Sequence, residues 1–108
     1  MDKQAELNSI LRIAEQRIVY AMRCARSADC CALVDPTIMK LVNEMMCSFE
    51  WLAEQVAIGS IHNARFYLDQ VSERMQSVCQ ESEAYAMRWR VLLGKPEVEK
   101  SVQGEMLL

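Results

Sequence analysis

The stretch that decides the fold is residues 36–58, PTIMKLVNEMMCSFEWLAEQVAI. Asp35 precedes it as a candidate N-cap, Pro36 suits the first turn of a helix, and Gly59 marks its end. Apolar residues follow one helical face at spacings of three and four: Ile38, Leu41, Val42, Met45, Phe49, Leu52 and Val56. The pattern therefore predicts a helix over 36–58.

The same stretch carries more apolar side chains than one face can hold. Those that lie off the main face are Met39, Met46, Trp51, Ala53 and Ile58. A helix that is apolar around most of its circumference must be covered on more than one side. We therefore expect this helix either to be the centre of a bundle or to form an interface with another chain.

A second helix is predicted upstream, over about residues 3–27, with Asp2 as its N-cap. Its apolar residues repeat in a heptad pattern: Leu7, Leu11, Ala14, Ile18, Ala21 and Ala25. A residue before proline is pushed out of the helical region, so the first helix must end by residues 34–35 at the latest. We expect the connection to Pro36 to be short. We therefore expect the first two helices to be antiparallel neighbours.

A third helix is predicted over residues 61–93, which contain neither Gly nor Pro and follow Ser60, a good N-cap. Such a helix is about 50 Å long, longer than the helix over 36–58, so one end should project. The projecting end would carry Tyr85, Trp89 and Leu92 as an exposed apolar patch, and such patches often mark partner sites. The alternative is a break at residues 80–82 that folds the last turns back onto the bundle.

Together these segments predict an all-α fold, an antiparallel bundle of three main helices over about 3–27, 36–58 and 61–93. The 108 residues include only three Gly and two Pro, as expected of a helical chain with few turns. Residues 1–95 would form a single domain, followed by a tail at 96–108. Because apolar surface is left over, we expect the bundle to be a homodimer.

Charge and hydropathy exclude several classes of function. The net charge of −3 argues against nucleic-acid binding, because such domains carry a basic excess. No apolar run is long enough to span a bilayer, and the first residues contain no apolar leader. We therefore expect no membrane association and a cytoplasmic location.

The chain also lacks the motifs of metal and catalytic sites. Its five cysteines include no C-x-x-C pair, and His62 is the single histidine. No glycine-rich phosphate loop or nucleophile motif is present. We therefore predict free thiols, no metal, no cofactor and no enzymatic activity.

Protein binding is the function that remains. The eight methionines favour a surface that re-packs around a partner, because unbranched thioether side chains adapt easily. The sequence predicts a non-enzymatic regulator, an inhibitor or antiactivator of, for example, a transcription regulator, that occupies an interface of its client. The candidate partner or dimer residues are Met39, Met46, Trp51, Ile58, Tyr85, Trp89 and Leu92.

Two alternatives stay open. One is a small helical enzyme or ligand sensor with a pocket that the sequence does not reveal, and the other is an adaptor similar to an export chaperone. In size and helical content the chain is similar to the small helical antiactivators and adaptor chaperones of bacteria, which occupy a client's interface. That similarity covers no motif and assigns no residue a role.

Overall fold

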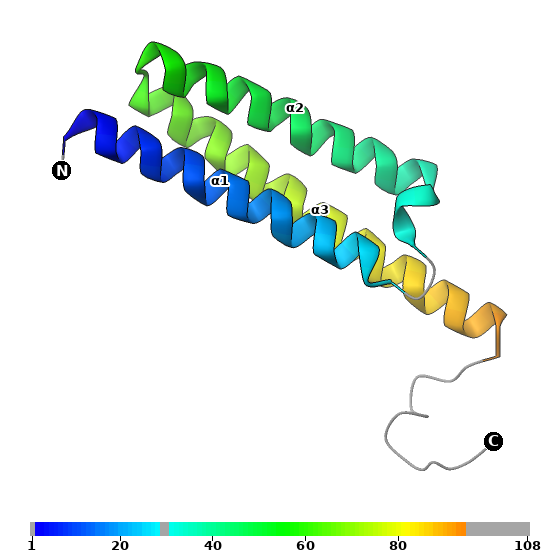
Figure 1. Ribbon diagram of the computed structural model, residues 1–108. Helices are drawn as coiled ribbons and strands as arrows, with labels where there is room; N and C mark the ends of the chain where they lie inside the picture. The colour runs from blue at the N-terminus through cyan, green and yellow to red at the C-terminus, as the bar shows by residue number, and fades with distance from the viewer. Residues whose placement is uncertain (1, 29–30, 95–108) are drawn as a thin grey trace.

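The computed structural model describes residues 2–28 and 31–94. Helix α1 covers Lys3–Arg26, a short 3-10 helix η1 covers Ala32–Val34, α2 covers Pro36–Ile58 and α3 covers Ile61–Leu92. The described part contains no strand. Helix α2 runs antiparallel to both α1 and α3 (Figure 1). The prediction of an all-α fold with three packed helices is confirmed.

Side-chain caps set the helix ends where the sequence predicted them. Asp2, Asp35 and Ser60 each accept a hydrogen bond from a backbone N–H in the first turn of the helix that follows. For Asp35 the distance from its Oδ1 to the Thr37 nitrogen is 2.8 Å. Gly59 ends α2 in the left-handed region, with φ of +83°, which only glycine adopts at no cost. Only two residues therefore separate α2 from α3.

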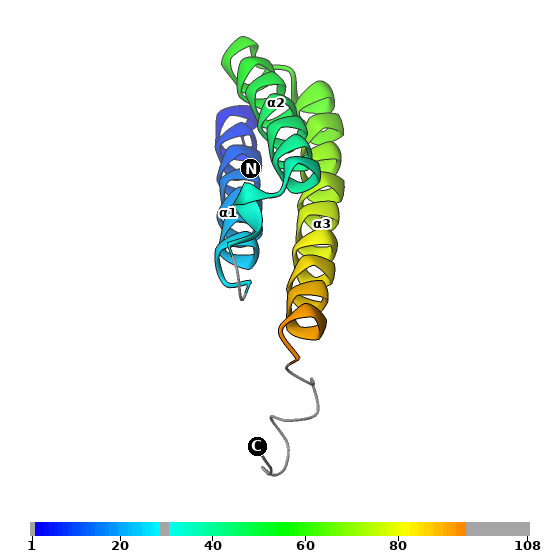
Figure 2. The same ribbon diagram turned by 90° about the vertical axis from the view of Figure 1, so that its right-hand side faces the viewer.

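Helix α3 is the longest element and holds the other two together. It contacts both α1 and α2, which touch each other over a smaller surface. It is continuous through residues 80–82, so the alternative of a break there is wrong. Its last turns extend beyond the ends of α1 and α2 (Figures 1 and 2). Val91, Leu92 and Leu93 are exposed on that projecting end.

The core lies along the line where the three helices meet. The most deeply buried large side chains are Leu7, Ile38, Met45, Leu52, Val71 and Val78. Helix α1 contributes mainly alanines, and Ala14, Ala21 and Ala25 have no exposed surface. Small side chains let α1 lie close to its neighbours, as the heptad pattern predicted.

Membrane-spanning helices and the C-terminal tail were also subjects of prediction from the sequence. Within residues 2–28 and 31–94, no helix combines the length and the apolarity that crossing a bilayer requires. The predicted tail at 96–108 lies outside the described residues.

Candidate functional site: a groove between α2 and α3

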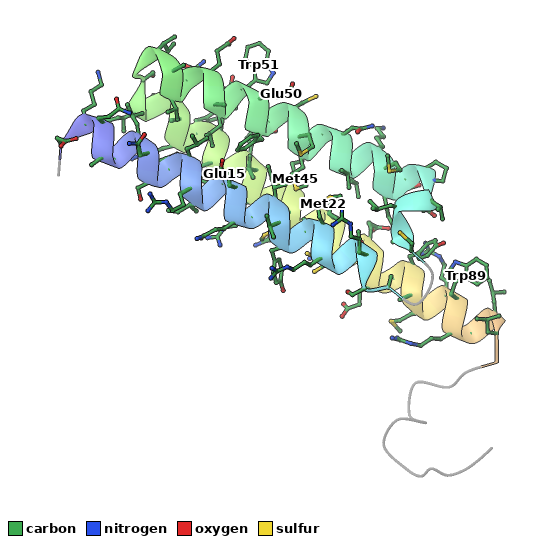
Figure 3. The ribbon with its side chains drawn as sticks, viewed as in Figure 1. Glu15, Met22, Met45, Glu50, Trp51 and Trp89 are labelled. Atoms are coloured by element: carbon green, nitrogen blue, oxygen red, sulfur yellow. The ribbon has the colours of Figure 1, made fainter. Side chains whose placement is uncertain are left out.

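The candidate residues on α2 are exposed in the structure. Met39, Met46, Trp51 and Ile58 expose between 37% and 69% of their surface. They do not form a single patch, because successive helical residues point about 100° apart. By that spacing Met46 and Trp51 point in directions about 140° apart. In Figure 3 Trp51 points away from the bundle, whereas Met45 lies between the helices.

The candidates on α3 divide into buried and exposed residues. Tyr85 is only 7% exposed, so the prediction that it lies on an exposed patch is wrong. The cause is a contact between elements that are far apart in the sequence. Helix η1 packs against α3, and Ala32 of η1 belongs to the same buried cluster as Tyr85. Trp89 is half-buried, and its ring contacts that of Tyr85 at 6.2 Å between centroids. Leu92 is 75% exposed, as predicted for the projecting end.

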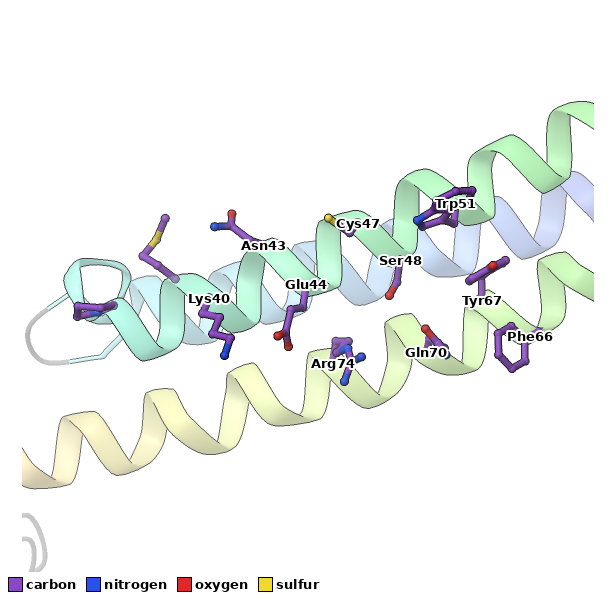
Figure 4. A pocket seen from close by; sticks show the side chains of 12 residues that line it. Lys40, Asn43, Glu44, Cys47, Ser48, Trp51, Phe66, Tyr67, Gln70 and Arg74 are labelled. Atoms are coloured by element: carbon purple, nitrogen blue, oxygen red, sulfur yellow. The ribbon is translucent and has the colours of Figure 1, made fainter.

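An open groove with a volume of about 910 Å³ lies between α2 and α3 (Figure 4). Two rows of side chains at four-residue spacing border it. The row on α2 is Met39, Asn43, Cys47 and Trp51, and the row on α3 is Phe66, Gln70 and Arg74. Met46 and Ile58 are not among the lining residues. The groove therefore gathers two of the seven candidates.

Three aromatic rings cluster at one end of the groove. The Trp51 and Tyr67 rings lie 6.3 Å apart and nearly parallel, and Phe66 meets Tyr67 edge to face at 5.1 Å. Trp51 and Phe66 are each 54% exposed. Figure 4 shows the Tyr67 ring between the two helices, with Trp51 on α2 and Phe66 on α3 at the same end of the groove. The cluster presents a large apolar area to solvent.

Sequence analysis missed Phe66 and Tyr67, although a signal was available. Trp51 precedes Gly59 by eight residues, and Tyr67 follows Ser60 by seven. A tight turn between antiparallel helices brings residues at equal distances from the turn side by side. The predicted turn at Gly59 and Ser60 was therefore enough to pair Trp51 with the aromatic residues of 66–67.

Polar groups lie in the middle of the groove. Glu44 of α2 and Arg74 of α3 face one another across it (Figure 4). The Nε of Arg74 is buried and has no hydrogen-bond partner. A buried donor without an acceptor costs about 1–3 kcal/mol. The Arg74 side chain lines the groove and carries a positive charge, so it favours an anionic group on a bound molecule.

The chemistry of the groove depends on which side chains line it. Among the residues that the structure describes, no group of three or more His, Cys, Asp or Glu side chains could hold a metal ion. His62 is exposed in the first turn of α3 and does not line the groove. The groove combines the apolar surface of the aromatic cluster with the charged side chains of Glu44 and Arg74.

Comparisons with known proteins add no relative to this description. No family model matches the chain, and searches of curated proteins and of solved structures return no match. The geometry of the groove and of the projecting end is therefore the basis on which function is inferred.

Proposed function

We propose that this protein is a non-enzymatic regulator that binds an amphipathic helix of another protein in the groove between α2 and α3. The observation that carries the proposal is the exposed aromatic cluster of Trp51, Tyr67 and Phe66. Tryptophan and tyrosine are enriched among the residues that dominate binding energy at protein interfaces. A solvent-exposed cluster of this kind is typical of a partner site.

The shape of the groove favours a helix as its occupant. Its rows on α2 and α3 both repeat every four residues, and helices pack by inserting a ridge of residues at this spacing into such a groove. A bound helix would become the fourth member of the bundle. Binding of this type is a recurring mode of peptide recognition.

The chemistry of the groove defines the occupant further. Phe66 and Arg74 are separated by eight residues, which corresponds to about 12 Å along α3. The partner helix should therefore carry a large apolar side chain and, about two turns away, a carboxylate. The carboxylate would pair with the guanidinium of Arg74, which lines the groove.

A partner helix held in this way would be unavailable to its own binding partners. This is how an antiactivator or an adaptor acts, and we propose this mode of action for the protein. We also propose a cytoplasmic setting, supported by the thiols of the four described cysteines, which are free.

The second part of the proposal is a homodimer formed by the projecting ends of α3. The buried seam of α3, which includes Val78 and Tyr85, continues at spacings of four and three to Trp89 and Leu92. Leu92 is 75% exposed there. Two such ends could cover each other across a twofold axis.

The groove is tested by comparing Trp51→Glu with Tyr20→Glu. Tyr20 is similarly exposed at 56% but lies on α1, away from the groove. Affinity capture from native lysate followed by mass spectrometry should identify a protein that binds the wild type and Tyr20→Glu. Trp51→Glu should retain at least about tenfold less, because interface tryptophans typically contribute 2 kcal/mol or more.

Circular dichroism must show equal helicity for the two variants. A folded Trp51→Glu protein that captures the same partner at wild-type level would exclude the groove. Native mass spectrometry that finds a small molecule in place of a protein would favour the ligand-sensor alternative.

The dimer is tested with Leu92→Asp and a control, Val34→Asp, which changes a side chain of similar exposure on η1. Light scattering after size-exclusion chromatography should give a dimer mass for the wild type and for Val34→Asp. Leu92→Asp should be monomeric at the same concentration. A monomeric wild type at high micromolar concentration would contradict the dimer.

A further inference from the structure

Helices α1 and α3 bring two cysteines together that are 55 positions apart in the sequence. The Sγ atoms of Cys24 and Cys79 lie 3.0 Å apart, and the Cys79 thiol donates a hydrogen bond to the Cys24 sulfur. A disulfide bond is about 2.05 Å long, so the sulfurs need to approach by only about 1 Å. Both thiols are free in this structure.

The pair can be reached from solvent. Cys24 and Cys79 are only partly buried, and both line a cavity of about 390 Å³ between α1 and α3. Ser82 and Glu83 also line this cavity. Its volume admits a small oxidant such as hydrogen peroxide, while the other described cysteines, Cys31 and Cys47, are exposed elsewhere on the surface.

We infer that Cys24 and Cys79 form a redox-sensitive site, which a peroxide oxidises to an intramolecular disulfide between α1 and α3. In the first step the Cys24 sulfur attacks one peroxide oxygen, the O–O bond breaks, and Cys24 becomes a sulfenic acid as one water leaves. In the second step the Cys79 sulfur attacks the Cys24 sulfur and displaces hydroxide. The Cys79 proton joins that hydroxide to form the second water. Two thiols and one peroxide thus give one disulfide and two waters.

The surroundings of the pair assign the order of these steps. Burial, the contact with Cys24 and the charge of Glu83 raise the pKa of the Cys79 thiol to about 12. Cys79 therefore stays protonated at neutral pH and is a poor first nucleophile. Its S–H already points at the Cys24 sulfur, which places Cys79 as the resolving thiol.

The disulfide would have a structural consequence. It closes a loop that contains η1 and the whole of α2, and it ties the last turns of α1 to the part of α3 near the projecting end. Cross-links that close loops of this length restrict the unfolded chain and raise the thermal midpoint, here by roughly 10 °C.

The site is tested by treating dilute native protein with hydrogen peroxide, blocking the remaining thiols by alkylation and mapping tryptic peptides. Trypsin separates Cys24, Cys47 and Cys79 into the peptides 24–26, 41–65 and 75–88, and places the other two cysteines in 27–40. We expect a loss of two mass units per chain and a cross-link between peptides 24–26 and 75–88. The thermal midpoint of unfolding should rise when the cross-link forms and return to its original value when the cross-link is reduced.

Matched variants complete the test. Cys24→Ser and Cys79→Ser should abolish both the cross-link and the shift of the midpoint, whereas Cys47→Ser should retain them. The inference is overturned if peroxide modifies only peptides 27–40 and 41–65 while Cys24 and Cys79 remain open to alkylation. A cross-link between other peptides, or one that forms only after denaturation, would overturn it as well.

Discussion

The two faces of α2 are built from the same kinds of side chain and have opposite surroundings. Met45 and Leu52 have no exposed surface, whereas their neighbours in the chain, Met46 and Trp51, expose 37% and 54%. One step along a helix turns a side chain by about 100°, which is enough to carry it from the core to solvent. Apolarity alone therefore does not tell which residues stabilise the fold and which are available to a partner.

The difference separates folding from binding in a single helix. The inner face is shared with α1 and α3 and cannot change without loss of the core. The outer face is largely open to solvent, although the ring of Trp51 stacks on that of Tyr67 in α3, so its apolar side chains contribute less to packing within one chain. Substitutions at matched positions on the two faces can measure this separation directly.

The largest effect is expected when a charge is placed on each face. Met45→Asp should lower the free energy of unfolding by roughly 4 kcal/mol or more, because it buries an unpaired carboxylate. Met46→Asp should change it by less than about 1 kcal/mol, because the charge stays solvated. Urea denaturation followed by circular dichroism gives both values. Equal effects would mean that both faces of α2 are buried in the native assembly.

A smaller effect is expected from removing apolar volume. Leu52→Ala should cost about 2–5 kcal/mol, because it leaves a cavity in the core. Ile58→Ala should cost less than about 0.5 kcal/mol, because Ile58 is largely exposed near the end of α2. The same denaturation experiment compares the two. A large cost at Ile58 would show that the outer face is covered in solution.

Removing the cap that starts α2 should cost less again. Asp35→Ala should lower the free energy of unfolding by about 1 kcal/mol, because the Thr37 and Ile38 N–H groups lose their acceptor. Asp35→Ser keeps an acceptor and should recover most of that energy. If Asp35→Ala left the free energy of unfolding unchanged, packing alone would set the start of α2.

A further prediction concerns the pH dependence of stability and a half-buried side chain of α3, Cys79. The pKa of Cys79 is raised from 9.0 to about 12, so the folded state favours the protonated thiol. Below pH 9 this preference is fully present, and it is lost as the pH rises from 9 to 12, where only the unfolded chain ionises. The free energy of unfolding of the wild type should therefore fall over that range relative to that of Cys79→Ser. A constant difference would contradict the raised pKa.

Helix boundaries were predictable from the sequence because the signals that set them are local. Asp2, Asp35 and Ser60 cap the first turns that directly follow them, and Gly59 ends α2 through its own backbone conformation. These interactions join residues within one turn of each other, so they are readable from short stretches of sequence.

The features that were not predicted depend on residues far apart in the chain. Tyr85 is covered because η1, more than fifty residues earlier, packs against α3. The approach of Cys24 to Cys79 likewise depends on how α1 lies on α3. Of the candidate site, the exposure of Trp51 and Leu92 followed from surplus apolarity, whereas the groove required the relative position of two helices.

The two-residue connection between α2 and α3 has a consequence for the order in which the chain folds. Contacts across this connection close short loops, whereas those between α1 and α3 bridge about fifty residues, and loop closure becomes slower as loops lengthen. We expect the α2–α3 hairpin to form in the transition state and α1 to dock afterwards. Leu52→Ala and Val71→Ala should then slow folding, while changes at Leu7 should mainly speed unfolding. Stopped-flow measurements of both rates would test this order.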